Sequence, residues 1–267
     1  MPGLRRRLPP RLGWPPRARP PRLRPPLAAR DATAVEEMDR ADADPATLRR
    51  TYAAFWPVNW CFSRPGQLYA EFVRPHLAHG RTGTVLDVGS GGGDIAAYLA
   101  RRADRDGYSL RVTGVDPNPA AHAFAAATHP DVEFRRATST DLVAEGARFD
   151  VVLSNHVLHH LTPAEFEALL RDSEELAVHA AVHADLRRSA VAYALFAVAA
   201  LPFAVRTFIR RDGLTSLRRS YSPSELRAVA RAGWSVETRA PFRNLLVFRG
   251  AGNARGTGVV RRSVAGD

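Results

Sequence analysis

The sequence predicts an α/β protein in which a doubly wound parallel sheet carries helices on both faces. Two observations lead to this fold. From residue 84 onward, short apolar segments typical of buried strands alternate with segments of helical periodicity. A glycine-rich turn at 89–93, G-S-G-G-G, separates the first of these strands from the first of these helices. In such sheets a ligand binds where the strand ends and the helix begins.

The individual elements follow from apolar runs and from helix start signals. The segments that read as strands are residues 85–88, 110–115, 132–136, 149–153, 180–185, 234–239 and 245–248. The segments that read as helices are 48–55, 68–73, 95–102, 120–127, 163–176 and the residues from 223 onward. Two helix starts are marked by a capping residue before a proline, Asp44-Pro45 and Ser222-Pro223.

The net charge of +11 comes almost entirely from the two ends of the 267-residue chain. Residues 1–34 contribute +8 and residues 251–267 contribute +2, which leaves +1 for residues 35–250. The expected domain is therefore nearly neutral. Its charge gives no reason to predict nucleic-acid binding.

The domain boundaries follow from the same change in composition. Residues 1–34 hold nine arginines and nine prolines, a composition that cannot bury enough apolar surface to offset the entropy of ordering. We expect disordered tails over 1–34 and 251–267 and one domain between them, with a helical cover over 35–82 and the core and acceptor segment over 83–250. A further hypothesis is that translation starts near Val35 or Met38, so that the arginine-rich segment is never made.

The number of cysteines and the lengths of the apolar runs indicate the cellular compartment in which we expect the protein. Cys61 is the only cysteine, which excludes an intrachain disulfide and fits a cytoplasmic protein. The longest uncharged apolar run, 190–205, has 16 residues, fewer than the roughly 20 that cross a bilayer. We therefore expect no stable membrane insertion. A buried or lid helix is the favoured interpretation of this run, and contact with a lipid surface is the alternative.

The glycine turn predicts a nucleotide-like ligand, because Gly89, Gly91 and Gly93 offer positions of positive φ on alternate residues. A dinucleotide fingerprint would have a small residue where this chain has Asp94, and a carboxylate at a helix start would repel a pyrophosphate. The next acid at a strand end, Asp116, lies 27 residues after Gly89, whereas about 20 is typical of dinucleotide sites. A nicotinamide-dependent oxidoreductase is therefore the less favoured alternative.

The sequence D-V-G-S-G-G-G at 87–93, followed by V-T-G-V-D at 112–116, resembles the cofactor loop and second-strand acid of class I S-adenosylmethionine-dependent methyltransferases. Asp87 adds a negative charge that suits a ligand carrying an amine or a sulfonium. The resemblance implies a Rossmann-like sheet of seven strands that ends in an antiparallel hairpin. It also implies S-adenosyl-L-methionine as the cofactor and a small phenolic or quinol-like acceptor. A non-catalytic cofactor-binding protein is the remaining alternative.

The predicted cofactor residues lie at the ends of strands. Asp116 is expected to bind the ribose, because one carboxylate accepts hydrogen bonds from two vicinal hydroxyls. The family has an acid near the adenine where this chain has Thr138, so we expect Thr138, Ser139 or Asp141 to make that contact. The predicted cofactor set is Asp87, Gly89, Gly91, Gly93, Asp116, Thr138, Ser139 and Asn155.

Three histidines follow the fourth strand, at His156, His159 and His160. Their i, i+3, i+4 spacing would place them on one side of a helical turn. Polar packing, a general base for a phenol-like acceptor and a metal site are the three open roles. The metal option rests on the resemblance, since some quinone-pathway O-methyltransferases carry acidic and histidine ligands in the corresponding turn. We predict these three residues as catalytic and predict no metal, although a divalent ion is compatible with them.

The acceptor is expected to bind between the end of the fifth strand, the apolar helix after it and the N-terminal helices. Asp185, Tyr193, Phe196 and Tyr52 are the predicted contacts. Aromatic and aliphatic walls with a few polar groups suit a planar, apolar small molecule. Ordinary core packing is the alternative for the three aromatic residues.

Overall fold

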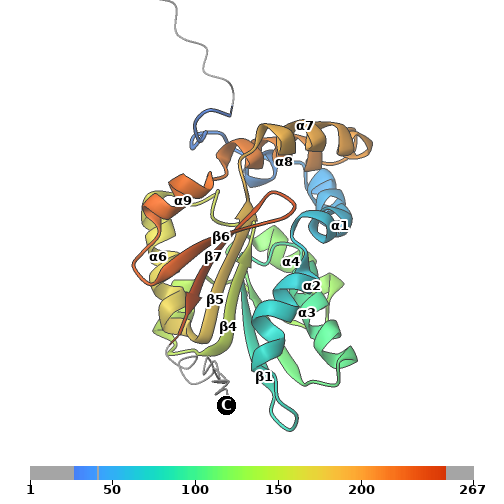
Figure 1. Ribbon diagram of the computed structural model, residues 1–267. Coiled ribbons are helices and arrows are strands. Elements are labelled where there is room, and N and C mark those ends of the chain that lie inside the picture. Colours follow the sequence, from blue (N-terminus) through green and yellow to red (C-terminus); the bar gives the residue numbers. More distant parts are fainter. Residues whose placement is uncertain (1–26, 41, 251–267) are drawn as a thin grey trace, which may run out of the picture.

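The computed structural model describes residues 27–40 and 42–250, and these contain one seven-stranded sheet (Figure 1). Its strands are β1 (Gly83–Val88), β2 (Leu110–Val115), β3 (Glu133–Arg135), β4 (Phe149–Asn155), β5 (Ala177–Leu186), β6 (Trp234–Arg239) and β7 (Arg243–Arg249). The order is β3-β2-β1-β4-β5-β7-β6. The first five strands are parallel, and β7 is antiparallel to both β5 and β6. The predicted doubly wound sheet with a terminal hairpin is confirmed.

Helices cover both faces of this sheet. The longer helices are α1 (Pro45–Phe62), α3 (Asp94–Arg105), α4 (Pro119–Thr128), α6 (Pro163–Leu176), α7 (Ala190–Ala199) and α8 (Ile209–Arg219). The shorter ones are η1 (Glu37–Asp39), α2 (Pro65–Leu68), η2 (Tyr69–Val73), η3 (Arg74–His76), α5 (Ser139–Ala144), η4 (Leu201–Phe203) and α9 (Pro223–Val229). Apolar side chains of α2, η2 and α3 pack on one face, and those of α5, α6 and α9 pack on the other. None of the helices in the described ranges is long and apolar enough to cross a membrane.

A third group of helices, α1, α7 and α8, lies at one end of the sheet (Figure 1). Leu186, the last residue of β5, packs in a cluster with Phe196 of α7 and Leu217 of α8. Phe55 and Phe62 of α1 pack against the same cluster. Because β5 ends there, these helices cover the carboxyl end of the parallel strands. This is the end of an open α/β sheet at which ligands bind.

Helix starts were predicted well where the capping residue is local. The Asp44 carboxylate accepts a hydrogen bond from the Thr47 N–H at the start of α1. Ser222 and Glu225 form a capping box at the start of α9. By contrast, α8 was not predicted, since it contains a glycine and is largely polar. Gly213 allows α8 to approach α7 closely, because a Cβ there would lie 2.3 Å from the Phe196 ring.

Residues 27–34 are packed on the domain, which differs from the predicted disordered tail over 1–34. Arg30 Nε donates to the Arg219 carbonyl at 2.6 Å and Nη2 to the His159 carbonyl at 3.0 Å. The Arg30 guanidinium also lies 4.1 Å from the centre of the Tyr221 ring. The predicted boundary at residue 35 is therefore wrong, because contacts between residues far apart in the sequence do not show in the amino-acid composition. The rest of that predicted tail, 1–26, and the predicted tail over 251–267 lie outside the described residues.

Candidate active site

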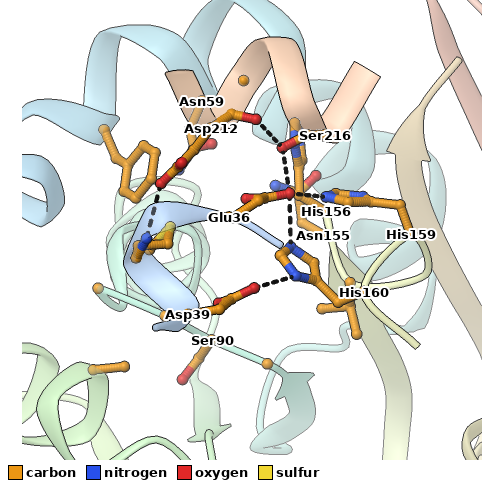
Figure 2. Close-up of a pocket in the computed structure, with 18 of the residues that line it drawn as sticks. Glu36, Asp39, Asn59, Ser90, Asn155, His156, His159, His160, Asp212 and Ser216 are labelled. Atoms are coloured by element: carbon orange, nitrogen blue, oxygen red, sulfur yellow. Dashed lines mark hydrogen bonds and ion pairs between the residues drawn. The ribbon is translucent and has the colours of Figure 1, made fainter. Parts of the chain in front are cut away.

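A cavity of about 460 Å³ lies at the carboxyl ends of the strands, bounded by α1, α7 and α8. This volume falls in the range of small-molecule sites. Figure 2 shows part of its lining. The predicted site residues that line it are Tyr52, Asp87, Gly89, Gly91, Asp116, Asn155, His156, His159, His160 and Phe196.

The glycine turn forms one wall of the cavity. Gly89, Gly91 and Gly93 have φ angles of 68°, 53° and 81°, all in the left-handed region that favours glycine. A Cβ at Gly89 would lie 2.5 Å from Val157, and one at Gly93 would lie 2.5 Å from Phe134. At Gly91 nothing lies within 4 Å of the same position. The turn is therefore packed behind Gly89 and Gly93 and open to a ligand at Gly91.

The Asp116 carboxylate is fixed beside this opening by two backbone donors. The Gly91 N–H donates to Asp116 Oδ2 at 2.9 Å, and the Asn118 N–H donates to Oδ1 at 2.8 Å. Burial raises the pKa of Asp116, while these two donors act in the opposite direction. The N-cap of α4 is Asn118, so Asp116 itself does not cap that helix. It lies at the cavity wall, where it can accept from a ligand.

Two further acids, Asp87 and Asp94, lie in the same wall. Asp87 is 1% exposed, and its Oδ2 has no hydrogen-bond partner among the described residues. Burial, reinforced by the charges of Asp94 and Asp116, raises the pKa of Asp87 well above its ordinary value. Asp94 accepts a hydrogen bond from Asn59 Nδ2 at 2.8 Å. An unpartnered buried carboxylate is costly, and a cationic ligand would compensate it.

The turn after β4 fixes His159 against Asp185. His159 Nδ1 lies 2.7 Å from Asp185 Oδ1, and the His159 N–H donates to Asp185 Oδ2 at 2.8 Å. Burial by itself lowers the pKa of His159, but the charge and hydrogen bond of Asp185, together with Glu36, raise it to about 9. The ring is therefore predominantly an imidazolium at neutral pH.

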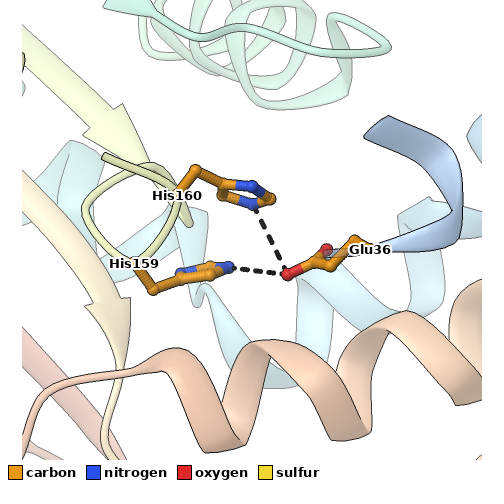
Figure 3. Close-up of side chains that lie close together, drawn as sticks. All are labelled: Glu36, His159 and His160. Carbon is orange, nitrogen blue, oxygen red and sulfur yellow. Dashed lines mark ion pairs between the residues drawn. The ribbon is translucent and has the colours of Figure 1, made fainter. Parts of the chain in front are cut away.

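Glu36 enters this site from the N-terminal segment, close to η1 (Figures 2 and 3). Its Oε1 accepts a hydrogen bond from Ser216 Oγ of α8 at 2.8 Å. The same oxygen lies 3.4 Å from His159 Nε2 and 3.7 Å from His160 Nε2. Burial opposes ionisation, but the hydrogen bond to His159 and the charges of both histidines lower the pKa of Glu36. Glu36 is not among the site residues predicted from the sequence.

The ligand atoms of Glu36, His159 and His160 lie within 4.8 Å of one another, so this group could hold a divalent ion (Figure 3). A carboxylate lies beside each Nδ1, Asp185 for His159 and Asp39 for His160 at 2.9 Å. Both Nε2 atoms therefore face Glu36. Such carboxylate partners commonly orient metal-ligating histidines.

His156 does not join this group. It has a φ of 60°, and its Nε2 lies 3.0 Å from Ser63 Oγ. Burial lowers the pKa of His156 to about 4, so its ring is neutral at pH 7. The expectation that one helical turn would present His156, His159 and His160 together is wrong, because the chain leaves β4 with a left-handed residue.

Several predicted site residues do not line the cavity. Thr138 caps α5, with its hydroxyl donating to Asp141 at 2.8 Å. The Ser139 hydroxyl donates to Asp172 at 2.7 Å and is buried. Both hydroxyls therefore serve local structure, and an adenine contact by either residue stays a prediction.

Three other predicted site residues also do not line the cavity. Gly93 provides room for Phe134 and is absent from the lining. Asp185 lies behind His159, and Tyr193 packs at the edge of the cluster formed by α7 and α8. Neither residue lines the cavity, and their contact with an acceptor stays a prediction.

Five residues of α8 line the cavity, none of them predicted, and two of these, Asp212 and Ser216, make hydrogen bonds to the N-terminal segment. Asp212 accepts hydrogen bonds from the Glu37 N–H at 2.8 Å and the Met38 N–H at 3.1 Å, which ties η1 to α8. Ser216 binds Glu36, as described above. No local pattern marks Asp212 or Ser216, because their partners are more than 170 residues away in the sequence.

Comparison with known proteins agrees with this geometry. Residues 85–179 match the family described as "Methyltransferase domain". A ubiquinone biosynthesis O-methyltransferase of Methylobacterium sp. (strain 4-46) is 32% identical over 139 residues, 49% of this chain and 53% of that protein. One from Azorhizobium caulinodans is 35% identical over 97 residues, 34% of this chain and 35% of that protein. The chain thus spans about half the length, or less, of these relatives.

A solved structure supports the fold. An O-methyltransferase family protein from Burkholderia thailandensis superposes with a TM-score of 0.54 at 20% identity, covering 76% of this chain and 59% of that chain. The family match over residues 85–179 and the shared fold agree with the resemblance to class I S-adenosylmethionine-dependent methyltransferases that the motifs carry.

Proposed function

We propose that the protein transfers the methyl group of S-adenosyl-L-methionine to a small, uncharged, hydroxylated acceptor of the phenol or quinol class. The observation that carries this proposal is the single cavity that joins the Asp116 and Gly91 wall to the apolar space under α7 and α8. A donor and an acceptor held in one enclosed space react as a unimolecular pair.

The residues present fit this cofactor. When bound, it supplies a methyl group on a positively charged sulfonium. Asp116 is placed to accept from the ribose hydroxyls, and the open position at Gly91 leaves room for the ligand against the backbone. Asp87, with its unpartnered buried oxygen, is suited to the cationic amine or sulfonium. Asn155 contributes a second unpartnered buried oxygen, Oδ1.

The acceptor class follows from charge and polarity. The carboxylates that line the cavity are Glu36, Asp39, Asp87, Asp94, Asp116, Glu165 and Asp212. No arginine lines it within the described ranges, and the chain has no lysine. A carboxylate or phosphate on the acceptor would therefore meet repulsion, because the His159 imidazolium is already paired with Asp185 and Glu36. The apolar wall of Phe55, Phe62, Phe196 and Leu217 favours an aromatic or aliphatic acceptor.

His159 is the histidine that we assign to the reaction, with Glu36 beside it. A hydroxyl attacks the methyl carbon as the carbon–sulfur bond breaks, and its proton must leave during or before that step. His159 and Glu36 lie at the cavity wall. The Glu36 carboxylate would accept the proton of the hydroxyl, and the His159 imidazolium would orient the hydroxyl oxygen. His160 sits next to them, and His156 is assigned a packing role.

The names of the two ubiquinone-biosynthesis relatives support an oxygen acceptor of this class. The alternative function of a nicotinamide-dependent oxidoreductase is not favoured, because Asp87 and Asp94 would repel the pyrophosphate of a dinucleotide. A cytoplasmic location is proposed on the basis of the single cysteine, Cys61.

Calorimetry and turnover test the proposal together. Titration with S-adenosylhomocysteine is expected to give saturable binding, and titration with NADH is expected to give none. Incubation with S-adenosylmethionine and a series of uncharged phenols and quinols should give methyl ethers, detected by mass spectrometry. Binding of the cofactor without turnover of any acceptor would instead support the non-catalytic alternative.

A further inference from the structure

The outer side of α7 carries a row of exposed apolar side chains. The row consists of Val191, Leu195, Val198, Leu201 and Val205, which are between 54% and 91% exposed, and we call it the apolar stripe. On α7, steps of four and three residues place Val191, Leu195 and Val198 along one side of the helix. Leu201 lies in η4, and Val205 follows it. Single exposed apolar residues are normal on protein surfaces, whereas a contiguous row indicates an interaction surface.

The segment that carries the stripe is positively charged. From Arg187 to Arg211 the sequence contains five arginines and no acid. Arg206 and Arg211, just beyond the end of the stripe, are exposed. Arg188 is engaged with Glu225 at 2.6 Å, so the arginines that follow the stripe are the ones available to a partner. The surface is thus apolar along α7 and basic at its end.

The opposite side of the same helix faces the cavity. Phe196 is buried, lines the cavity and packs edge-on against Phe62 of α1, with 5.6 Å between ring centres. Leu195 and Val198, its neighbours on α7, belong to the exposed stripe. A single helix therefore separates the apolar half of the cavity from the apolar surface of the protein.

We propose that the apolar stripe rests on a lipid surface containing anionic headgroups and that the cavity receives an apolar acceptor from that surface. The identity of the acceptor rests on the proposed methyltransferase function, but the lipid contact does not. A short helix with an apolar side and neighbouring arginines is typical of segments that lie in the membrane interface. A second copy of the chain fits this face less well, because a symmetric pair would bring the basic ends of both stripes into one interface.

Vesicle flotation tests the lipid contact directly. The full-length protein should float with phosphatidylcholine vesicles that contain phosphatidylglycerol and much less with phosphatidylcholine alone. The triple variant Val191→Ser/Leu195→Ser/Val198→Ser should bind far more weakly, by on the order of tenfold per side chain removed from lipid. Arg206→Glu/Arg211→Glu should weaken binding by at least about fivefold per arginine. Val229→Ser, at an exposed apolar residue of α9, and Arg171→Glu, on α6, are the matched controls.

A turnover comparison links the contact to the reaction. The stripe variant should methylate a water-soluble phenol as the unchanged protein does, because no member of the stripe lines the cavity. It should lose most of its rate with an alkylated phenol supplied in vesicles. If the unchanged protein methylates neither phenol yet floats, the proposed function fails and the lipid contact stands.

Two results would overturn the inference. One is equal flotation of the unchanged protein and the stripe variant, with matching thermal unfolding of both. The other is no flotation, together with a concentration-dependent dimer in sedimentation that Leu195→Ser abolishes, which would assign the stripe to a second copy of the chain.

Discussion

Glu36 Oε1 lies 3.4 Å from His159 Nε2, so two residues 123 positions apart form a buried ion pair at the wall of the cavity. Both side chains are nearly inaccessible, at 3% and 1% exposure. Burying a charge is tolerated only when it is paired and hydrogen-bonded. Asp185 on one side and Ser216 on the other complete the pairing. The N-terminal segment therefore contributes chemistry to a site that the cofactor motifs alone would not include.

Glu36→Gln is expected to lower turnover by roughly a hundredfold or more while leaving S-adenosylhomocysteine affinity nearly unchanged, because the carboxylate lies on the acceptor side. His159→Ala should show the same division between turnover and cofactor binding. Steady-state kinetics and calorimetry measure the two effects. Glu37→Gln is the control, since it removes the same charge from the neighbouring, more exposed position. Full activity of Glu36→Gln would remove this residue from the reaction.

Treatment with a chelator distinguishes two roles for Glu36 and His159. If Glu36, His159 and His160 hold a divalent ion, a chelator should abolish turnover and the added ion should restore it. If the pair acts through proton transfer or orientation alone, chelation should leave the rate unchanged while His159→Ala remains inactive. We expect the second result, because Asp185 and Glu36 already balance the His159 imidazolium without an ion. Restoration of activity by zinc or magnesium would contradict this expectation.

Asp116→Ala should weaken S-adenosylmethionine binding by about 1–3 kcal/mol, the cost of losing hydrogen bonds to a charged group. The loss includes the support that Asp116 gives to the Gly91 N–H. Calorimetry measures the effect, and Asp131→Ala provides the control, because Asp131 is an exposed acid in the link between α4 and β3. Equal affinity of both variants would mean that Asp116 does not contact the ligand.

Features with a local cause could be predicted from the sequence. The glycine turn, the acid at the end of β2 and the helix starts at Asp44 and Ser222 each depend on residues close together in the chain, and the structure places them as expected. The alternation of strands and helices likewise predicted the parallel sheet, and the family resemblance implied its terminal hairpin. The T-S-T-D sequence at 138–141 is also a capping pattern, and the structure shows Thr138 and Asp141 in a capping box.

Features that depend on distant partners could not be predicted. Glu36 is one of several acids in an acidic stretch, and only the folded chain brings it to His159. Asp212 and Ser216 lie in a largely polar helix whose role becomes visible only when the backbone of η1 docks on it. The left-handed conformation of His156 breaks the expected helical spacing of the histidines. Tertiary contacts, rather than propensity, decide these positions.

Asp212 should make stability depend on pH. Burial raises the pKa of Asp212 from 3.8 to about 7, and the charges of Glu36 and Asp39 add to this effect. A carboxyl group whose folded-state pKa is raised stabilises the fold below its unfolded pKa, and this contribution is lost as the pH rises through the folded pKa. The unchanged protein should therefore lose stability relative to Asp212→Asn between about pH 4 and about pH 7.

Urea unfolding of both proteins at several pH values across this window tests the prediction. The Asn variant gives up one of the two backbone hydrogen bonds at all pH values, which lowers its stability by a constant amount and leaves the slope informative. The free energy of unfolding of Asp131→Asn, a change at an exposed site, should vary with pH as that of the unchanged protein does. A difference between Asp212→Asn and the unchanged protein that does not vary with pH would contradict the raised pKa. The pKa of His159, about 9, is higher than that of Asp212. The contribution of His159 to the pH dependence of stability therefore falls largely above this window.

Truncation of the N-terminal segment should have a sharp limit between Leu27 and Val35. A protein that begins at Leu27 keeps Arg30, which donates to the carbonyls of Arg219 and His159. A protein that begins at Val35 loses both hydrogen bonds and the stacking on Tyr221, at a cost of about 2 kcal/mol. The second truncation should therefore lower the thermal unfolding midpoint. It should also reduce turnover, because the His159 carbonyl is then held by Arg219 alone.

Arg30→Ala in the full-length chain separates this contact from the rest of the truncated segment. This variant should show most of the loss of thermal stability and turnover that is expected of the protein that begins at Val35. Arg40→Ala removes an exposed arginine paired with Asp42 and should have little effect. Differential scanning calorimetry and methyl-transfer assays on the four proteins make the comparison. If the protein that begins at Val35 matches the one that begins at Leu27 in both measurements, residues 27–34 are dispensable. The hypothesis of a translation start near Val35 would then gain support over the structural role assigned here to Arg30.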